Sequence, residues 1–472
     1  MTRDEAAAGS SPLPPSPASF RDPSGRVYLG ADAVYRTIGE GFIENWHLAE
    51  SSGFLAEAVT RGRLCPFETV TPFPGSRATL KIPRLPFISY PYEWCFSQLK
   101  DAALLTLELL READARGLTL KDASAYNIQF QGPAPIFIDH LSFEKAEAGR
   151  PWGGYLQFCR HFLGPLALQA CRGSLCGRLS ALWMDGLPLD FVVELLPRRT
   201  WLSPWLLIHL HLHRRMQRKH QDARRSAEAA RAVRLGSKGI ARLADSLTAA
   251  VEGLKPSARK TEWGEYYQDT NYTPAGAEDK ARQVAAVAAA HPGRLAVDLG
   301  SNTGVFSRLL AAHFNLVLAV DLDHQAVENQ YLRLKTGGPA NILPLLQDMA
   351  NPTPSLGWGE EERDSFSRRV RADFLSALAL VHHLVFSAGI PLAKVAEYFA
   401  RLLDDGGRLL LEFVPLEDSQ VRRLLAAREN IFPKYNLEGC LEAFGRHFFL
   451  ESRRSILDSE RTLLVLRKRR SA

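Results

Sequence analysis

The second half of the chain alternates short apolar runs with longer stretches of helical periodicity. The apolar runs are rich in Val, Leu and Ala and are bounded by polar residues or glycine, which is typical of buried strands. The stretches between the first five runs are long enough for helices, whereas the last two runs are too close together for a crossover helix. This pattern predicts a Rossmann-like, mostly parallel seven-stranded sheet with an antiparallel last strand. The predicted strands are 294–299, 316–320, 342–346, 372–381, 408–414, 448–452 and 462–466.

Residues 21–200 follow a different pattern and predict a separate N-terminal α+β domain. Leucines recur at helical spacing through residues 101–116, which predicts an amphipathic helix there. After Gly117 the chain continues as LTLKDASAYNIQF, turns at Gly132 and runs through an apolar segment that ends at Asp139. We therefore expect a helix, followed after the turn by an apolar run that ends at Asp139.

Residues 201–257 begin with the apolar piece WLSPWLLIHL and continue as an Ala/Arg-rich segment of high helix propensity. We expect a basic helical connector between the two domains, either solvated or in contact with an anionic partner such as nucleic acid or membrane headgroups. His209, His211 and His213 alternate within it, but on a helix they do not share one face, which argues against a metal site. The predicted organisation is a disordered tail (1–20), the N-terminal domain (21–200), this connector and a C-terminal domain (258–472).

The composition is that of an ordinary soluble protein. Of the 472 residues, 46% are hydrophobic and 23% charged, and 58 basic against 52 acidic side chains give a net charge of +6. The six cysteines form no Cys-x-x-Cys pair, so neither a disulfide framework nor a Cys-rich zinc site is expected. The first 20 residues lack the apolar segment of a signal peptide. Residues 374–393 carry no charge, but they contain two histidines and Gly-Ile-Pro, so we expect a strand and a loop there, and a cytoplasmic protein without a membrane span.

The strand at 294–299 runs into Asp298-Leu-Gly300-Ser-Asn302-Thr-Gly304, followed by a helical pattern. Glycines allow a ligand to approach the backbone closely, and the start of a helix offers free N–H groups, so this is a nucleotide-binding corner. Asp298 would repel a pyrophosphate, but it suits a ligand that carries an ammonium group. S-adenosylmethionine is such a ligand.

The next two strands also end in acidic residues. Asp321 stands where a carboxylate can accept hydrogen bonds from both ribose hydroxyls. Asp348 could accept a hydrogen bond from the adenine amino group, and Met349 could pack against the base. We expect the carboxylates at these three successive strand ends to share one cleft.

Residues 262–467 resemble the class I S-adenosylmethionine-dependent methyltransferases, on the Asp-x-Gly-x-x-x-Gly motif and the acidic end of the second strand. Asn302 stands where many members have glycine, and Asn tolerates unusual backbone angles. His382 and His383 follow the fourth strand, where the resemblance places the acceptor in members that act on small molecules. Methyl transfer is an in-line displacement that needs alignment and, for some nucleophiles, a base. Either histidine could supply that base, or both could be packing residues; no metal is required.

Upstream, residues 263–272 are unusually aromatic. Tyr267 could cover the cofactor and contact its sulfonium by a cation–π interaction, or the segment could simply seal the edge of the domain. The larger pattern, including EFVPLEDSQVRRLLAARENIFPKY at 412–435, resembles a bacterial group of two-part methyltransferases that includes NoeA-type nodulation proteins. That resemblance implies, for some members, a role in modifying a signalling glycolipid.

Asp122, Asn127 and Asp139 resemble the phosphotransfer loops of kinase-like folds, including aminoglycoside phosphotransferases. The resemblance implies that Asp122 orients an acceptor hydroxyl and that Asn127 and Asp139 hold a metal. Leu120-Lys121 and the lack of a glycine-rich loop depart from the family, and Lys81 is a weak candidate for the phosphate lysine. Three alternatives stay open: turn capping without chemistry, a degenerate kinase-like module that binds the acceptor or a partner domain, and active phosphotransfer.

The sequence thus predicts a methyltransferase that acts on a small-molecule or glycan acceptor. A noncatalytic S-adenosylmethionine-binding scaffold is the alternative of a different class. Nucleic acid ranks lower as an acceptor, because no recognised RNA-binding module is present and the basic residues lie outside the proposed cleft.

Overall fold

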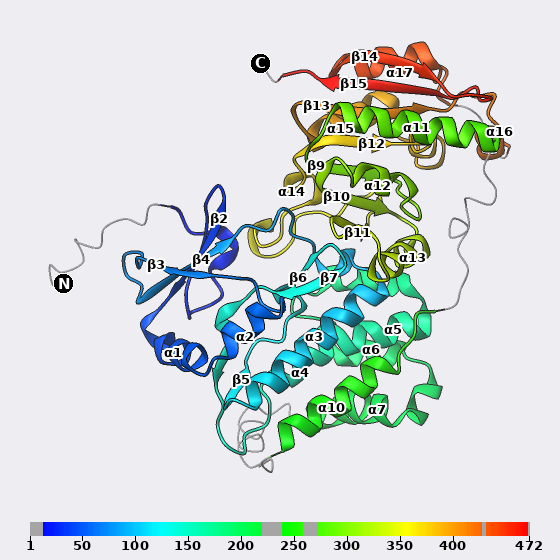
Figure 1. The fold of residues 1–472 in the computed structure, drawn as a ribbon. Helices are drawn as coiled ribbons and strands as arrows, with labels where there is room; N and C mark the ends of the chain where they lie inside the picture. Colours follow the sequence, from blue (N-terminus) through cyan, green and yellow to red (C-terminus); the bar gives the residue numbers. More distant parts are fainter. Residues whose placement is uncertain (1–12, 220–237, 258–271, 427–430, 471–472) are drawn as a thin grey trace. The chain divides into compact units, whose positions relative to one another are not determined.

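The computed structural model describes residues 13–219, 238–257, 272–426 and 431–470 (Figure 1). The chain divides into two compact units, neither of which is one continuous stretch. The first comprises Met1–Phe130, Ala134–Ala258 and Leu356–Arg363, and the second comprises Gln131–Pro133, Arg259–Ser355 and Asp364–Ala472. Within the described ranges, every helix is too short or too polar to cross a membrane.

The second unit is built on a seven-stranded sheet in the order β11-β10-β9-β12-β13-β15-β14. Neighbouring strands are parallel from β11 through β13, and β15 is antiparallel to both β13 and β14. The predicted seven-stranded sheet with its antiparallel last strand is therefore confirmed. The strands are β9 (Gly293–Leu299), β10 (Phe314–Asp321), β11 (Ile342–Leu346), β12 (Ala372–Ala377), β13 (Leu403–Phe413), β14 (Phe448–Ser455) and β15 (Thr462–Lys468).

Helices pack on this sheet, and the central strands are apolar because both of their faces are covered. Residues 342–346 of β11 are all buried, and β9 is buried from Leu295 to its end. The core joins residues of the central strands to apolar residues of the helix that precedes β9, such as Val284 and Val287. The helices are α11 (Pro274–Ala290), α12 (Val305–Leu310), α13 (His324–Lys335), α14 (Phe366–Arg369), α15 (Leu392–Leu402), α16 (Ser419–Leu425) and α17 (Leu437–Gly445).

The strand predicted at 372–381 is shorter than expected. β12 ends at Ala377, and Ala379 has a φ of 51°, a left-handed conformation that cannot continue a strand. A turn and a π-helix at His383–Ser387 follow. The expected strand is therefore present in the uncharged stretch 374–393, but short helical segments stand where a loop was expected.

The first unit contains a four-stranded antiparallel sheet in the order β1-β2-β4-β3 and a long helix, α3 (Phe96–Asp114), which confirms the helix predicted from the leucine pattern. Two short strand pairs, β5 with β8 and β6 with β7, follow α3. The strands are β1 (Val27–Leu29), β2 (Ala33–Ile38), β3 (Glu68–Val70), β4 (Ala78–Pro83), β5 (Leu118–Leu120), β6 (Ile128–Gln131), β7 (Ala134–Phe137) and β8 (Phe143–Lys145).

The end of the predicted disordered tail is ordered. Residues 17–19 form a 3-10 helix, and the backbone N–H of Ser16 donates to Val27 O at 2.7 Å. This pairing with the β1 region satisfies polar backbone groups, which is why residues 13–20 adopt one conformation. Residues 1–12 lie outside the described ranges.

The described parts of 201–257 are helical and pack within the first unit. They comprise α7 (Pro204–Leu206), a π-helix (Leu207–Leu212), α8 (His213–Lys219) and α10 (Gly239–Glu252), which packs on α3. His209 hydrogen-bonds Tyr155 and Ser246, and His211 hydrogen-bonds Thr200. His209 and His211 are thus engaged by side chains of the first unit.

The segment Leu356–Arg363 lies between β11 and β12 in sequence but belongs to the first unit. Both oxygens of the buried Glu362 carboxylate accept hydrogen bonds from the Arg21 guanidinium, at 2.7 and 2.6 Å. The Arg363 guanidinium lies 4.3 Å from the centre of the Tyr126 ring. A bidentate pair and a cation–π contact hold this segment in the first unit.

Candidate functional site

β9 occupies the switch point of the sheet, because β10 lies on one side of it and β12 on the other. The connections that leave the carboxyl ends of strands on either side of such a point diverge, and ligands of open α/β sheets bind in the crevice between them. β9 ends at Leu299, and the glycine turn 300–304 leads from it into α12. The Asp-x-Gly-x-x-x-Gly motif thus lies at the switch point, where the crevice between the diverging connections is expected.

The glycine turn is held in a conformation that requires left-handed backbone angles. Gly300, Asn302 and Gly304 have φ values of 71°, 49° and 75°. A Cβ atom on Gly304 would lie 1.8 Å from the Nε2 atom of Gln330, so a larger residue would displace that side chain. Asn302 therefore fills a position that many members of the resembled family give to glycine, in a conformation that Asn tolerates.

Asp298 lies beneath this turn and is almost completely buried, with 2% of its surface exposed. Its Oδ2 atom accepts a hydrogen bond from Ser307 Oγ at 2.6 Å. Burial raises the pKa of Asp298 to about 6, because desolvation penalises the charged form more than the hydrogen bond from Ser307 favours it.

Asp321 ends β10 and is tied to the glycine turn. Its Oδ2 atom accepts the backbone N–H of Asn302 at 2.7 Å, and its Oδ1 atom accepts that of Asp323 at 2.8 Å. Burial raises the pKa of Asp321 to about 6, because desolvation outweighs the two hydrogen bonds, which by themselves would lower it. An ionised carboxylate has about four acceptor positions, so each oxygen keeps capacity for one more donor.

The end of β11 adjoins Asp321, whose backbone carbonyl accepts the N–H of Gln347 at 2.9 Å. Asp348 follows, and its Oδ1 atom accepts the backbone N–H of Ala350 at 2.9 Å. Met349 is half-buried beside it. Asp298, Asp321 and Asp348 therefore come from the ends of three adjacent parallel strands, as the sequence predicted. Tyr267, the predicted cover, lies outside the described residues.

His382 and His383 follow β12, at the same edge of the sheet as the glycine turn. Their ring centroids lie 4.1 Å apart. His382 is 1% exposed and its Nδ1 atom has no hydrogen-bond partner, whereas His383 is half-buried. Burial lowers the pKa of His382 well below its usual value and that of His383 to about 4. Both imidazoles are therefore neutral at pH 7.

A buried ionic cluster that we did not predict borders these histidines. Lys280 Nζ of α11 lies 2.6 Å from Glu412 Oε2 at the end of β13. Arg461, just before β15, places Nη1 3.3 Å from Glu412 Oε1 and Nε 2.8 Å from Asp418 Oδ2. Tyr272 donates its hydroxyl hydrogen to Glu412. We call these five residues the Glu412 cluster.

The Glu412 cluster sets the electrostatics of this edge. Burial opposes the ionisation of Glu412, but Lys280 and Arg461 hold its pKa below the usual value. The same two cations contribute, after burial, to the lowered pKa of His382, and Arg461 does so for His383. The sequence did carry one signal for the cluster, since Glu412 is the only charged residue within the apolar run LLLEFV.

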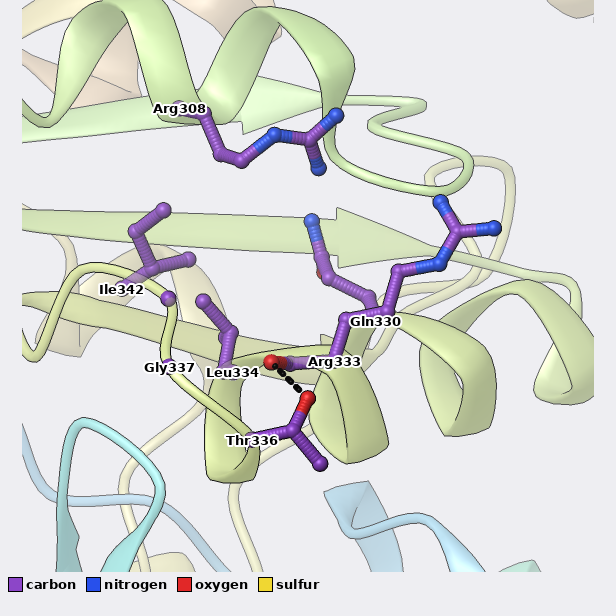
Figure 2. A pocket seen from close by; sticks show the side chains of 8 residues that line it. Arg308, Gln330, Arg333, Leu334, Thr336, Gly337 and Ile342 are labelled. Atoms are coloured by element: carbon purple, nitrogen blue, oxygen red, sulfur yellow. Dashed lines mark hydrogen bonds between the residues drawn. The ribbon is translucent and has the colours of Figure 1, made fainter.

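A cavity of about 270 Å³ lies in the second unit between α12, α13 and the start of β11. Figure 2 shows the side chains of Arg308, Gln330 and Arg333 around it. None of the predicted site residues lines it. One lining residue, Gln330, also touches the glycine turn, because its side chain packs against Gly304.

In the first unit, the structure brings together the three residues of the kinase-like pattern. Asn127 Nδ2 donates to the backbone carbonyl of Asp122 and to Ser142 Oγ, both at 3.3 Å, and Ser142 Oγ donates to Asp139 Oδ2 at 2.6 Å. The Arg36 guanidinium lies 3.6 Å from Asp139 Oδ1. Burial and the Asp139 charge raise the pKa of Asp122.

This donor set does not fit a preformed metal site. Asp139 already accepts from Ser142 and faces Arg36, and Asn127 is the remaining oxygen donor that the pattern offers. Among the described residues, no group of three His, Cys, Asp or Glu side chains could hold a metal ion. The hydrogen bonds instead stabilise the two loops against each other.

Comparison with curated proteins decides the family. The chain is 36% identical over 468 residues to the nodulation protein NoeA of Rhizobium meliloti (strain 1021), and the match covers 95% of each protein. The chain belongs to the NoeA family. Because the match spans nearly the whole length, both units are family features. No protein-family model matches the chain.

Solved structures resemble the NoeA-family chain over less than half of its length. The N-methyltransferase NodS from Bradyrhizobium japonicum WM9, in complex with S-adenosyl-L-homocysteine, is 13% identical and covers 44% of this chain and 93% of its own, with a TM-score of 0.33. The magnesium protoporphyrin IX methyltransferase from Synechocystis PCC 6803, with bound S-adenosyl-L-homocysteine, is 20% identical and covers 44% and 92%, with a TM-score of 0.31.

Proposed function

We propose that the second unit binds S-adenosylmethionine and transfers its methyl group in line to a small-molecule or glycan acceptor. The observation that carries the proposal is the set of three carboxylates at adjacent strand ends around a left-handed glycine turn at the switch point. This donor set suits a cationic nucleoside, because carboxylates repel a pyrophosphate and accept hydrogen bonds from ribose hydroxyls, an amino group and an ammonium.

Each residue has a proposed role in binding. Asp321 accepts hydrogen bonds from the ribose hydroxyls through the capacity left on its two oxygens. Asp348 accepts from the adenine amino group, and Met349 packs against the base. Asp298 provides the negative charge that attracts the ammonium end, and Tyr267 covers the sulfonium. The glycine turn supplies the left-handed backbone angles that let its N–H groups face the ligand, since Gly300 and Gly304 both have positive φ values.

S-adenosylmethionine supplies the methyl group as part of a sulfonium, so the chain's own residues need only align the acceptor and, for a hydroxyl, remove a proton. We propose His383 as that base, with His382 packed behind it. Burial and the Arg461 charge lower the pKa of His383, so its imidazole is neutral at pH 7. The neutral ring can take up a proton during transfer, as a weaker base than a solvated histidine.

Calorimetric titration with S-adenosylmethionine and S-adenosyl-L-homocysteine tests the binding step. A labelled-methyl assay on extracts, and a comparison of metabolites in cells with and without the gene, then test transfer. Binding accompanied by features shifted by one methyl mass supports the enzyme. Binding without any methylated product supports a noncatalytic scaffold, and no binding by the folded chain contradicts both.

One observation supports the kinase-like hypothesis for the first unit: Ser142 hydrogen-bonds both Asn127 and Asp139, so two residues of the pattern lie close together. We propose a kinase-like module that does not transfer phosphate, because Asp139 is already engaged. Equilibrium titration with magnesium-ATP, on the full chain and on Asp139→Ala, tests this. Binding by the full chain that the substitution abolishes would contradict the proposal and establish a nucleotide site.

A further inference from the structure

The helical run that starts at Pro204 has one face fixed in the first unit. Leu206, His209, Leu210 and His211 are buried along it. His209 hydrogen-bonds Tyr155 through Nδ1 at 2.8 Å and Ser246 through Nε2 at 2.7 Å. These contacts determine how the run is rotated, and therefore which residues its other face presents to solvent.

The other face is apolar. The preceding turn and this face expose Leu202, the most exposed large hydrophobic residue of the described chain at 85%, and five more large apolar side chains. Those on the helical run recur every three or four residues, which places them along one side. Monomeric proteins rarely expose contiguous apolar surface of this kind, and such patches mark interaction sites. We call it the Trp205 face; it consists of Trp201, Leu202, Trp205, Ile208, Leu212 and Met216.

Trp201 is joined to the helical run by ring contacts. Its indole stacks on His211 with ring centroids 4.3 Å apart, and the Arg215 guanidinium lies 5.1 Å from the indole centre. The turn that carries Leu202 is therefore packed against the helix. The Trp205 face therefore combines this turn with the helical run, and Arg215 lies beside Trp201.

Unpaired cations border the Trp205 face. Arg198, Arg199 and Arg215 are exposed, and no ion pair links them to a carboxylate within the described part of the chain. Arg214, by contrast, is neutralised by Asp190 and Glu194. The stretch 201–257 holds 11 basic and 4 acidic residues, so the surplus charge continues along the sequence.

The combination of exposed apolar side chains and unpaired arginines favours one of three possible partners for the Trp205 face. Nucleic acid would satisfy the arginines but would leave aliphatic side chains such as Leu202 and Ile208 without apolar contacts. A second copy in a two-fold contact would bring the same exposed arginines together across the interface. A bilayer accommodates both features, since it offers acyl chains to the apolar residues and anionic headgroups to the arginines.

We propose that the Trp205 face is a peripheral docking surface for a membrane that contains anionic phospholipid. The helix lies in the plane of the interface, the aliphatic residues enter the boundary between headgroups and acyl chains, and the tryptophans lie at headgroup level. The arginines contact lipid phosphates. The proposal does not depend on methyl transfer, because it concerns the first unit alone.

Vesicle flotation of the full chain tests it. We expect binding to vesicles made of equal amounts of phosphatidylcholine and phosphatidylglycerol, and little binding to phosphatidylcholine alone. Leu202→Ser and Ile208→Ser should each weaken binding by about tenfold. Arg198→Gln and Arg199→Gln should each weaken it by about fivefold and make it less sensitive to salt. Leu29→Ser is the matched control, because Leu29 is 50% exposed on β1.

Three outcomes would overturn the proposal: no binding of the full chain to the anionic vesicles, binding that all the variants retain, or weakening by Leu29→Ser equal to that by Leu202→Ser. Sedimentation in solution provides a further test. A dimer that Leu202→Ser dissociates would assign the Trp205 face to a second copy instead. Unchanged melting temperatures would show that the variants are folded.

Discussion

The Asp321 carboxylate accepts the backbone N–H of Asn302 at 2.7 Å, so the acid that ends β10 holds the turn that follows β9. Replacing it should therefore remove ligand contacts and loosen the turn. We expect Asp321→Ala to weaken S-adenosylmethionine binding by about 100-fold and Asp321→Asn by about tenfold, because the amide retains one acceptor oxygen. Calorimetry measures both. Unchanged affinity in Asp321→Ala would refute the ribose assignment.

Cofactor affinity should depend on pH. The pKa values of Asp298 and Asp321 are raised to about 6, and their ionised forms, which bind the cationic ligand, are populated above that value. We therefore expect affinity to be nearly constant from pH 7 to 8 and to fall below pH 6, by up to about tenfold per pH unit for each carboxylate. Titrations from pH 5 to 8 check this. Asp321→Asn should flatten the dependence, and a flat profile in the unmodified protein would contradict the expectation.

Gly304→Ala should weaken cofactor binding by about tenfold, because it combines a left-handed φ with a clash against Gln330. The double variant Gly304→Ala/Gln330→Ala should recover part of the loss, since it relieves the clash but not the backbone strain. Gly406→Ala is the control: Gly406 has a φ of 81°, but a Cβ there meets no atom within 4 Å. If the control weakens binding as much, the clash is not the cause.

The Glu412 cluster should dominate the stability of the second unit. Glu412→Gln leaves Lys280 and Arg461 buried beside a neutral group, and we expect the free energy of unfolding to fall by about 3 kcal/mol. The single variant Lys280→Met should lower the free energy of unfolding by a similar amount, whereas the double variant Lys280→Met/Glu412→Gln should lose less than the sum of the two single losses. Urea denaturation followed by circular dichroism measures the cycle. Additive losses would mean that the two residues do not act as a pair.

The histidine pair should separate binding from transfer. We expect His383→Asn to lower kcat for a hydroxyl acceptor by at least 100-fold while leaving cofactor affinity unchanged. Because the pKa of His383 is lowered to about 4, its deprotonation should not produce a limb near pH 6.5 in the kcat profile. The control is His382→Asn, which should reduce stability more than kcat. Equal kcat in both variants and the unmodified protein would show that neither histidine is a base.

Local patterns in the sequence predicted the parts of the structure that depend on neighbouring residues. The strands of the second unit, the glycine turn and the acidic strand ends follow from apolar runs and from residues a few positions apart. The end of β12 was misplaced, because the left-handed conformation of Ala379 has no signature in an alanine. The Glu412 cluster was missed for another reason: Tyr272 and Arg461, which hydrogen-bond each other, lie 189 residues apart.

The return of the chain to the first unit at Leu356–Arg363 has a practical consequence for dissecting the protein. A fragment that starts at residue 259 would contain Glu362 but not Arg21, so a carboxylate that is sequestered from water in the full chain would lose its counter-charge. No single cut separates the halves cleanly. A truncation that removes the second half also removes residues 356–363 from the first unit, so its effect should not be assigned to the second unit alone.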